Sequence, residues 1–376
     1  MFDIKPFRPI SISDDRHFQG HQMKVLVTGT EGYIGSRMAP ILRACGHSVV
    51  GLDIGFYRDG CLYMDPVGLP WLPQTIVRDL RSVTPADFEG FDAVIHLAEL
   101  SNDPLGQNRP EITFKINHEG SVRIARAARE AGVKRFVYAS SCSVYGVGSG
   151  EDFLDETSPT NPQTAYAQCK VNVERDLLPM AGSDFCVTFL RNATAYGPSQ
   201  RMRFDIVLND LCALAWTRKK IAMLSDGSPW RPIVHIEDII QAFRCVLEAP
   251  ESTVNGEVFN VGASSENYRV REIAAIVAEA FPGCEVSAGP PSKDNRSYRV
   301  SFDKIASGLP GFTSHWTAKR GAEELRTLFE RIEFGVAEHE FRAFTRLKQL
   351  KYLQRTGQID DDLFWRSISG HGCAAD

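Results

Sequence analysis

The segment KVLVTGTEGYIG, residues 24–35, decides the fold of this chain. Its VLV run is apolar on consecutive positions, which is typical of a strand buried on both faces. Gly29, Gly32 and Gly35 follow in the pattern T-G-x-x-G-x-x-G and open a predicted helix. Tight turns use glycine for many reasons, but glycines between a strand and a helix let backbone amides approach a pyrophosphate. The segment therefore predicts a dinucleotide-binding turn.

An acidic residue follows where a dinucleotide-binding fold needs one. Asp53 ends the next predicted strand, so its carboxylate can accept hydrogen bonds from both hydroxyls of a ribose. Arg58 comes shortly after it and could meet the 2′-phosphate of NADP, but the carboxylate of Asp53 would repel that phosphate. The sequence therefore predicts NAD rather than NADP as the cofactor.

Strands and helices alternate along the first half of the chain. Runs such as AVIHLA and RFVYAS are apolar on consecutive positions, which indicates strands buried on both faces. The alternation predicts an α/β fold with a doubly wound parallel sheet of the Rossmann type. Predicted strands cover 24–28, 48–53, 75–77, 93–97, 135–140 and 186–190. Predicted helices between them begin near Tyr33, Asn108, Thr164 and Phe204.

The pattern changes after Arg191, where loops rich in Pro, Gly and Ser separate shorter elements. This change predicts a smaller substrate domain interleaved with the first domain, to which a helix and the strand EVFNVG return. We expect an N-terminal arm at 1–22, an NAD-binding domain at 23–190 joined by 236–262, a substrate domain at 191–235 and 263–316, and a helical tail at 317–376.

The tail contains one strongly predicted helix, at 342–354. Its apolar residues Phe344, Leu347, Leu350 and Leu353 share one helical face. That face could pack on the rest of the chain or on a partner, and packing on its own chain is the simpler expectation.

Composition excludes several classes of protein. The 376 residues carry 42 basic and 47 acidic side chains, and a net charge of −5 does not fit a nucleic-acid-binding protein. No apolar run approaches the ~20 residues that cross a bilayer, and the first residues do not form a secretory signal. The nine cysteines include no C-x-x-C pair, so we expect no metal site and a reducing, cytoplasmic location.

Two further segments carry residues suited to catalysis. SSCSVYG, residues 140–146, ends a predicted strand, and YAQCK, residues 166–170, lies on the next helix. A spacing of four places Tyr166 and Lys170 on one helical face. The lysine charge lowers the pKa of the tyrosine, so that the phenol can act as a base near neutral pH. A serine at the carboxyl end of the sheet can hold the same substrate oxygen.

With these residues the chain resembles the extended short-chain dehydrogenase/reductase family of NAD-dependent nucleotide-sugar epimerases and dehydratases. The resemblance covers roughly 24–316. Beyond the motifs above, it depends on HLA at 96–98, Asn117 with Gly120, Arg191 followed by YGP at 196–198, and Arg231 followed by His235 and Asp238.

The resemblance implies a catalytic triad of Ser141, Tyr166 and Lys170, with Lys170 also contacting the nicotinamide ribose. Helices beginning near Asn108 and Thr164 resemble those that pair between subunits in this family, which implies a homodimer. Asp79 either accepts a hydrogen bond from the adenine amine or caps a turn. The implied cofactor contacts are Gly29, Gly32, Tyr33, Ile34, Gly35, Asp53, Asp79, Leu80, Leu97, Ala98, Asn117, Ser140, Tyr166 and Lys170.

The resemblance also implies a nucleotide-diphosphate sugar as substrate. Arg231 would contact its phosphate or uridine side, and Arg296 and Arg299 either bind the pyrophosphate, because guanidinium groups match phosphate geometry, or form surface ion pairs. The candidate substrate contacts are Ser101, Ser143, Thr194, Arg231, Arg296 and Arg299. His96 closes a buried strand and is interpreted as a packed core histidine.

The chain departs from the family pattern beside the catalytic serine. The 4,6-dehydratases of this family carry an acidic pair where this chain has Cys142 and Ser143. A neutral pair disfavours standard dehydration and favours epimerisation. Cys142 could act as an acid or base if its pKa were shifted, but filling space as a small hydrophobic residue is the simpler interpretation.

Three other positions depart from the family pattern, and the last two lie toward the substrate. Glu99 stands where relatives have a small residue, and it is either a proton-transfer carboxylate with a raised pKa or a solvated loop residue. Thr194 occupies the usual asparagine position, with Asn192 shifted by two, and Pro232 replaces the usual aspartate. We therefore expect a sugar or nucleotide other than the commonest UDP-hexose.

The sequence as a whole predicts an NAD-dependent nucleotide-sugar epimerase that acts through a transient 4-keto sugar. A dehydratase or a 4-ketoreductase on the same fold is the alternative. A non-catalytic NAD(H) sensor is disfavoured, because such proteins commonly lose the tyrosine or the lysine, and Tyr166 and Lys170 are both present.

Overall fold

The computed structural model describes residues 22–64, 72–101, 109–148, 152–291 and 296–366. Most of the predicted N-terminal arm, the predicted helix start near Asn108 and the cysteine at 373 lie outside these residues. Within them, all eight cysteines are free, and no group of three or more His, Cys, Asp or Glu side chains could hold a metal ion. No helix in the same residues has the length and apolar character needed to span a membrane.

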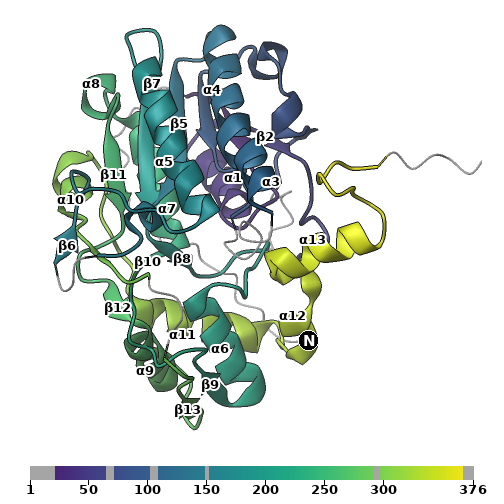
Figure 1. The fold of residues 1–376 in the computed structure, drawn as a ribbon, viewed down its shortest axis with the longest axis vertical. Coiled ribbons are helices and arrows are strands. Elements are labelled where there is room, and N and C mark those ends of the chain that lie inside the picture. The colour runs from purple at the N-terminus through teal and green to yellow at the C-terminus, as the bar shows by residue number, and fades with distance from the viewer. Residues whose placement is uncertain (1–21, 65–71, 102–108, 149–151, 292–295, 367–376) are drawn as a thin grey trace, which may run out of the picture.

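A parallel sheet of seven strands forms the centre of the molecule (Figure 1), in the order β11-β7-β5-β4-β1-β2-β3. The predicted doubly wound sheet is therefore confirmed. The order reverses between β1 and β4, and ligands of such sheets bind at the carboxyl ends of the strands beside this point. The strands are β1 (Lys24–Thr28), β2 (Ser48–Asp53), β3 (Thr75–Val77), β4 (Ala93–His96), β5 (Arg135–Ser141), β7 (Cys186–Asn192) and β11 (Val258–Val261).

Helices cover both faces of this sheet because its central strands are apolar on both sides. Val25 and Val27 of β1 belong to one core cluster, and Leu26 between them belongs to a second. The first cluster includes side chains of α1 (Gly35–Ala44) and α7 (Ile236–Glu248). The second includes side chains of α4 (Ser121–Glu130) and α5 (Ala165–Leu177).

Short helical turns complete the layer that contains the seven-stranded sheet. They are η1 (Leu80–Ser82), η2 (Pro85–Phe88), α3 (Pro110–Thr113), the π-helix η3 (Phe114–Gly120), η4 (Cys142–Tyr145), η5 (Leu178–Met180) and α8 (Glu251–Val254).

The remaining elements form a smaller layer beside the carboxyl ends of the strands. Three strands pair in the order β12-β10-β8, and two further pairs join β13 to β9 and β14 to β6. The strands are β6 (Phe153–Leu154), β8 (Thr194–Tyr196), β9 (Lys220–Ala222), β10 (Trp230–His235), β12 (Asn267–Arg269), β13 (Glu285–Ser287) and β14 (Arg299–Val300). The helices are α6 (Val207–Arg218), α9 (Val270–Ala280), α10 (Asp303–Gly308), α11 (Ala318–Arg331) and α12 (Val336–Glu340).

The first core cluster continues without a break into this layer. Ile273 of α9 and Phe329 of α11 belong to the same cluster as Val25 of β1. The segment predicted to return to the sheet does so, since α7 packs against α1 and β11 pairs with β7. The exact division into an NAD-binding and a substrate domain stays a prediction.

The tail packs on its own chain, as expected. A 3-10 turn, η6 (Arg342–Phe344), precedes α13 (Arg346–Arg355). Phe344 belongs to the first core cluster, whereas Leu350 and Leu353 belong to the second. In Figure 1 the yellow α13 lies beside α3, at the side of the molecule and at the height where the two layers meet.

Candidate active site

The glycine turn opens one end of a pocket of about 600 Å³. Gly29 has a positive φ of 78°, and a Cβ there would lie 2.9 Å from the backbone nitrogen of Ala98. A Cβ on Gly35 would lie 2.1 Å from the carbonyl oxygen of Gly29. The turn therefore tolerates no larger side chain at these two positions, and it presents bare backbone to the pocket. This is the geometry that a dinucleotide diphosphate requires at the start of a helix.

Asp53 lines the same pocket at the end of β2. Its carboxylate accepts hydrogen bonds from the backbone N–H groups of Gly55 at 2.7 Å and Glu31 at 3.0 Å. Burial raises the pKa of Asp53 to about 6 in spite of these donors. Arg58 lies 3.4 Å from Glu31 as an ion pair. The residues thus fit NAD, with a ribose-binding carboxylate and an arginine already paired with an acid.

Asp79 and Leu80 line the pocket. Asp79 caps η1 by accepting from the backbone N–H of Arg81 at 2.8 Å, and its carboxylate also forms an ion pair of 2.6 Å with the Arg81 guanidinium. The structure therefore shows the turn-capping role of Asp79.

Asn117 does not line the pocket, although Leu97 and Ala98 do. Its side chain accepts from the N–H of Leu100 at 2.8 Å and donates to the C=O of the same residue at 3.0 Å. It thereby fixes the backbone that follows β4. His96 is the packed core histidine that was predicted, because its ring nitrogens contact the hydroxyls of Thr28 and Ser121 and burial lowers its pKa to about 3.

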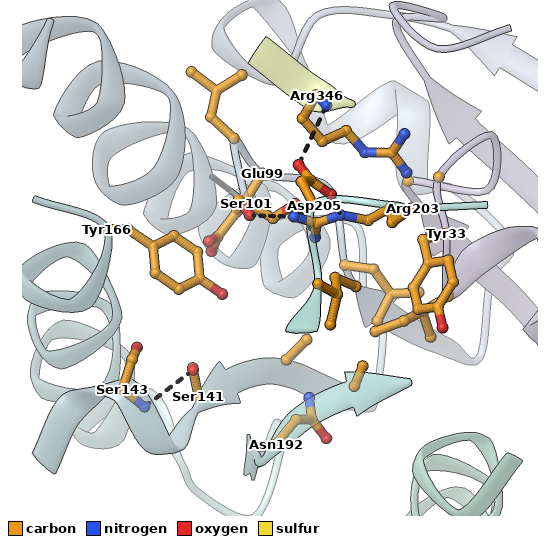
Figure 2. Close-up of a pocket in the computed structure, with 18 of the residues that line it drawn as sticks. Tyr33, Glu99, Ser101, Ser141, Ser143, Tyr166, Asn192, Arg203, Asp205 and Arg346 are labelled. Carbon is orange, nitrogen blue, oxygen red and sulfur yellow. Dashed lines mark hydrogen bonds and ion pairs between the residues drawn. The ribbon is translucent and has the colours of Figure 1, made fainter. Parts of the chain in front are cut away.

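Ser141 and Tyr166 point into the same space in Figure 2, from the end of β5 and from the first turn of α5. The hydroxyl of Ser141 accepts from the backbone N–H of Ser143 at 3.1 Å. The Nζ atom of Lys170 lies 5.3 Å from the centre of the Tyr166 ring. Ser141, Tyr166 and Lys170 therefore all line one pocket. Their role as a catalytic triad stays a prediction.

Glu99 is a buried partner of the lysine. Its side chain is 3% exposed and lies 2.8 Å from the Nζ atom of Lys170 as an ion pair. The Tyr138 hydroxyl donates to the same carboxylate at 2.6 Å. Burial alone would lower the pKa of Lys170, but the charge of Glu99 outweighs it and holds that pKa above its ordinary value. The interpretation of Glu99 as a solvated loop residue is wrong, because its side chain is buried and paired with Lys170 of α5.

Cys142 faces the core rather than the pocket. It is 1% exposed, belongs to the first core cluster and directs its Sγ toward the C=O of Arg191 at 3.1 Å. Burial raises its pKa well above the ordinary value. Because η4 turns the side chains after Ser141 in different directions, Cys142 packs inward while Ser143 lines the pocket. The structure supports the space-filling interpretation of Cys142 and not the acid–base one.

The pocket also brings together most of the predicted substrate contacts. Ser101, Ser143, Thr194, Arg231 and Arg296 all line it. Arg299 lies outside this lining, with its guanidinium 4.0 Å from the centre of the Phe153 ring.

The profile of the NAD dependent epimerase/dehydratase family matches residues 25–262, which include the glycine turn, Asp53, Ser141, Tyr166 and Lys170. The chain belongs to this family. It is therefore an enzyme of a family whose members depend on NAD, and the residues described above fit that cofactor.

Individual members of the epimerase/dehydratase family that resemble the chain catalyse different reactions. A UDP-glucose 4-epimerase of Mycolicibacterium smegmatis is 32% identical over 272 residues, 69% of this chain and 82% of the relative. A dTDP-D-glucose 4,6-dehydratase of Mus musculus is 30% identical over 301 residues, 76% of this chain and 82% of the relative. The structure of MoeE5 in complex with UDP-glucose and NAD has a TM-score of 0.68 and 29% identity, and covers 82% of this chain and 99% of MoeE5.

Several residues that line the pocket of this chain were not predicted from its sequence. Asn192 was noted only as a shifted asparagine, yet it lines the pocket and its amide donates to the C=O of Ser140 at 3.4 Å. Arg203 and Asp205 also line the pocket. They lie shortly after the YGP segment at 196–198, and this proximity to a motif could have predicted them. Arg346 comes from the tail, beyond the residues matched by the family profile, and no local pattern predicts its position.

Proposed function

We propose that this enzyme is an NAD-dependent nucleotide-diphosphate-sugar epimerase that acts through a transient 4-keto sugar. Bound NAD+ would accept a hydride from the sugar and return it, so the cofactor would leave the cycle unchanged. Tyr166 would take the proton of the C4 hydroxyl, and the charge of Lys170 would favour the phenolate. Ser141 would donate a hydrogen bond to the same oxygen as the ketone forms.

The observation that favours epimerisation over dehydration is the environment beside Ser141. Dehydration needs an acid for the leaving hydroxyl and a base for the neighbouring C–H. Cys142 faces the core, and Ser143 is a neutral hydroxyl. The carboxylate of Glu99 lies in the pocket wall but is paired with Lys170. The ketone would then be reduced again after the sugar turns within the pocket, which gives the 4-epimer.

Arg231 and Arg296 line the pocket, and their guanidinium groups would contact the diphosphate of the substrate. The solved structures of similar proteins with UDP-glucose and with UDP-glucuronic acid support a nucleotide sugar of this general kind. We also propose a cytoplasmic homodimer, with α3 to α5 at the subunit interface.

The decisive test combines a substrate panel with Tyr166→Phe. The purified enzyme should release bound NAD(H) on denaturation and interconvert one pair among UDP-, dTDP-, GDP- and CDP-sugars without added cofactor. Tyr166→Phe should lower kcat at least ~100-fold because it removes the base, whereas Tyr352→Phe on α13 should not.

Each other outcome contradicts a stated part of this proposal. A product lighter by one water would identify a dehydratase, and stoichiometric consumption of added NADH would identify a ketoreductase. Retention of most activity by Tyr166→Phe would show that Tyr166 is not the base.

A further inference from the structure

Two arginines from distant parts of the chain line the active-site pocket together. Arg203 precedes α6, and Arg346 is the first residue of α13. Arg346 is 3% exposed, and the side chain of Arg203 is 14% exposed. Figure 2 shows both residues around Asp205, which accepts from the Arg203 Nε at 2.8 Å and from the backbone N–H of Arg346 at 3.3 Å.

Contacts connect this pair with the cofactor half of the pocket. The amide of Asn209 donates to the hydroxyl of Tyr33, in the glycine turn, at 3.2 Å and to the C=O of Arg203 at 3.1 Å. The guanidinium of Arg346 lies 4.1 Å from the centre of the Tyr57 ring, shortly beyond Asp53 along the chain. Arg346 therefore lies beside the segment that follows β2, and the backbone of Arg203 lies near the glycine turn. The Arg203 guanidinium itself donates to the hydroxyl and to the C=O of Ser101, at 3.2 Å each.

The positive charge here exceeds the negative charge that faces it. Arg203 is paired with Asp205, but no carboxylate of the described residues forms an ion pair with the guanidinium of Arg346. Within the part of the chain that the structure describes, that guanidinium donates only two long hydrogen bonds, of 3.4 Å each, to the carbonyl oxygens of Ala343 and Arg201. Burial and the neighbouring Arg203 lower the pKa of Arg346 to about 10, so it remains charged at neutral pH.

A buried charge normally has an opposite charge beside it, because its desolvation is otherwise costly. A surplus guanidinium in a pocket wall is thus a site for an anion. The bare backbone of the glycine turn places the diphosphate of a dinucleotide in this half of the pocket. The planar donor fork of arginine matches phosphate oxygens.

We propose that Arg346, supported by Arg203, binds the diphosphate of NAD, so that the C-terminal helix α13 completes the cofactor site. This inference uses the NAD dependence of the family and adds a ligand contact from a segment that the family profile does not match. An anionic group of the sugar nucleotide has the same chemistry, and the experiment below distinguishes the two sources.

The test measures binding to the cofactor-free full-length enzyme by calorimetry, with NAD, ADP-ribose, adenosine and UDP-glucuronic acid as ligands. Arg346→Gln should weaken NAD and ADP-ribose about tenfold, the usual effect of losing one charge-assisted contact of about 1.4 kcal/mol. Adenosine, which has no phosphate, should change less than twofold. Arg346→Lys should recover part of the loss. Arg355→Gln, at the exposed end of the same helix, should bind all four ligands like the wild type.

Three results would overturn the inference. Unchanged affinity for ADP-ribose in Arg346→Gln would exclude the diphosphate contact. Equal losses for adenosine and ADP-ribose would show a change of shape rather than of charge. A loss confined to UDP-glucuronic acid would assign the pair to the substrate. The melting temperature of each cofactor-free variant checks folding, and a wild-type enzyme that binds no NAD would instead contradict the proposed function.

Discussion

At the scale of single residues, Asp53 shows how burial tunes a ligand-binding group. The folded chain raises the pKa of this carboxyl from 3.8 to about 6, chiefly by burial. Since the folded state then holds the proton more tightly than the unfolded state, Asp53 by itself makes the cofactor-free protein less stable as pH rises from 4 to 6. Ribose hydroxyls that donate to the carboxylate would favour its ionised form.

NAD binding should therefore depend on pH in the range where Asp53 titrates. The dissociation constant of NAD should rise about tenfold between pH 7.5 and pH 5, because a protonated carboxyl is a poorer acceptor. Asp53→Asn should bind NAD more weakly at pH 7.5 and show little pH dependence. Calorimetry across this range measures both effects, and a steep pH dependence that persists in Asp53→Asn would assign the titration to another group.

Glu99 and Lys170 illustrate a second effect at this scale. Two charges that would each be costly to bury are held together at 2.8 Å, with Tyr138 donating to the same carboxylate. Glu99 thus stabilises the charge of Lys170, and Lys170 in turn would favour the phenolate of the proposed base, Tyr166. Its amine also donates to the C=O of Ala139, the residue before the two serines that end β5.

At the scale of elements, α5 carries both Tyr166 and Lys170, so the start of this helix positions the proposed base. Thr164 caps it by accepting from the N–H of Ala167 at 3.2 Å. Thr317 caps α11 in the same way, accepting from the N–H of Arg320 at 3.3 Å. Unlike Thr164, Thr317 begins a helix that contributes no residue to the pocket lining.

These two caps provide a matched pair of variants. Thr164→Ala and Thr317→Ala should each lower the free energy of unfolding by about 1 kcal/mol, the usual value of an N-cap hydrogen bond. Only Thr164→Ala should also lower kcat, since it loosens the turn that holds Tyr166. Urea unfolding and steady-state kinetics on the substrate identified by the panel measure the two effects. Equal kcat values in both variants would show that α5 keeps its position without this cap.

At the scale of the whole molecule, one apolar core joins the two layers. Residues of α1 on the sheet and of α9 and α11 in the smaller layer belong to the same cluster. The tail reinforces this connection, because Phe344 packs into that cluster and Leu350 into the other. Among the described residues, the buried apolar side chains of the smaller layer form no cluster separate from that of the sheet.

The cofactor-free enzyme should consequently unfold in one cooperative transition. Far-UV circular dichroism reports mainly the helices of both layers, and near-UV circular dichroism reports the packed aromatic side chains. The two signals should have the same midpoint in urea. Separate midpoints would show that the layers are stable independently, contrary to the continuous core.

The sequence predicted the sheet well, and it placed Tyr166 and Lys170 together, because both features depend on local patterns. Buried strands such as 135–140 are apolar on consecutive residues, and Tyr166 with Lys170 depends only on helical spacing. The structure extends that strand to Ser141 because Ser141 pairs with Asn192 of β7.

Features that depend on the meeting of distant segments could not be predicted in this way. The direction of Cys142 is set by η4, and the burial of Glu99 depends on a lysine supplied by α5. The position of Arg346 depends on the path of the whole tail, which no neighbouring residue encodes.

The contribution of α13 to the pocket has a consequence for how the enzyme matures in the cell. Protein synthesis proceeds from the N-terminus, so the glycine turn leaves the ribosome long before Arg346 has been made. A nascent chain therefore contains the glycine turn of the pocket before Arg346, which also lines the pocket, has been made. Loading of the cofactor is thus expected after translation, once the tail has folded back onto the body of the enzyme.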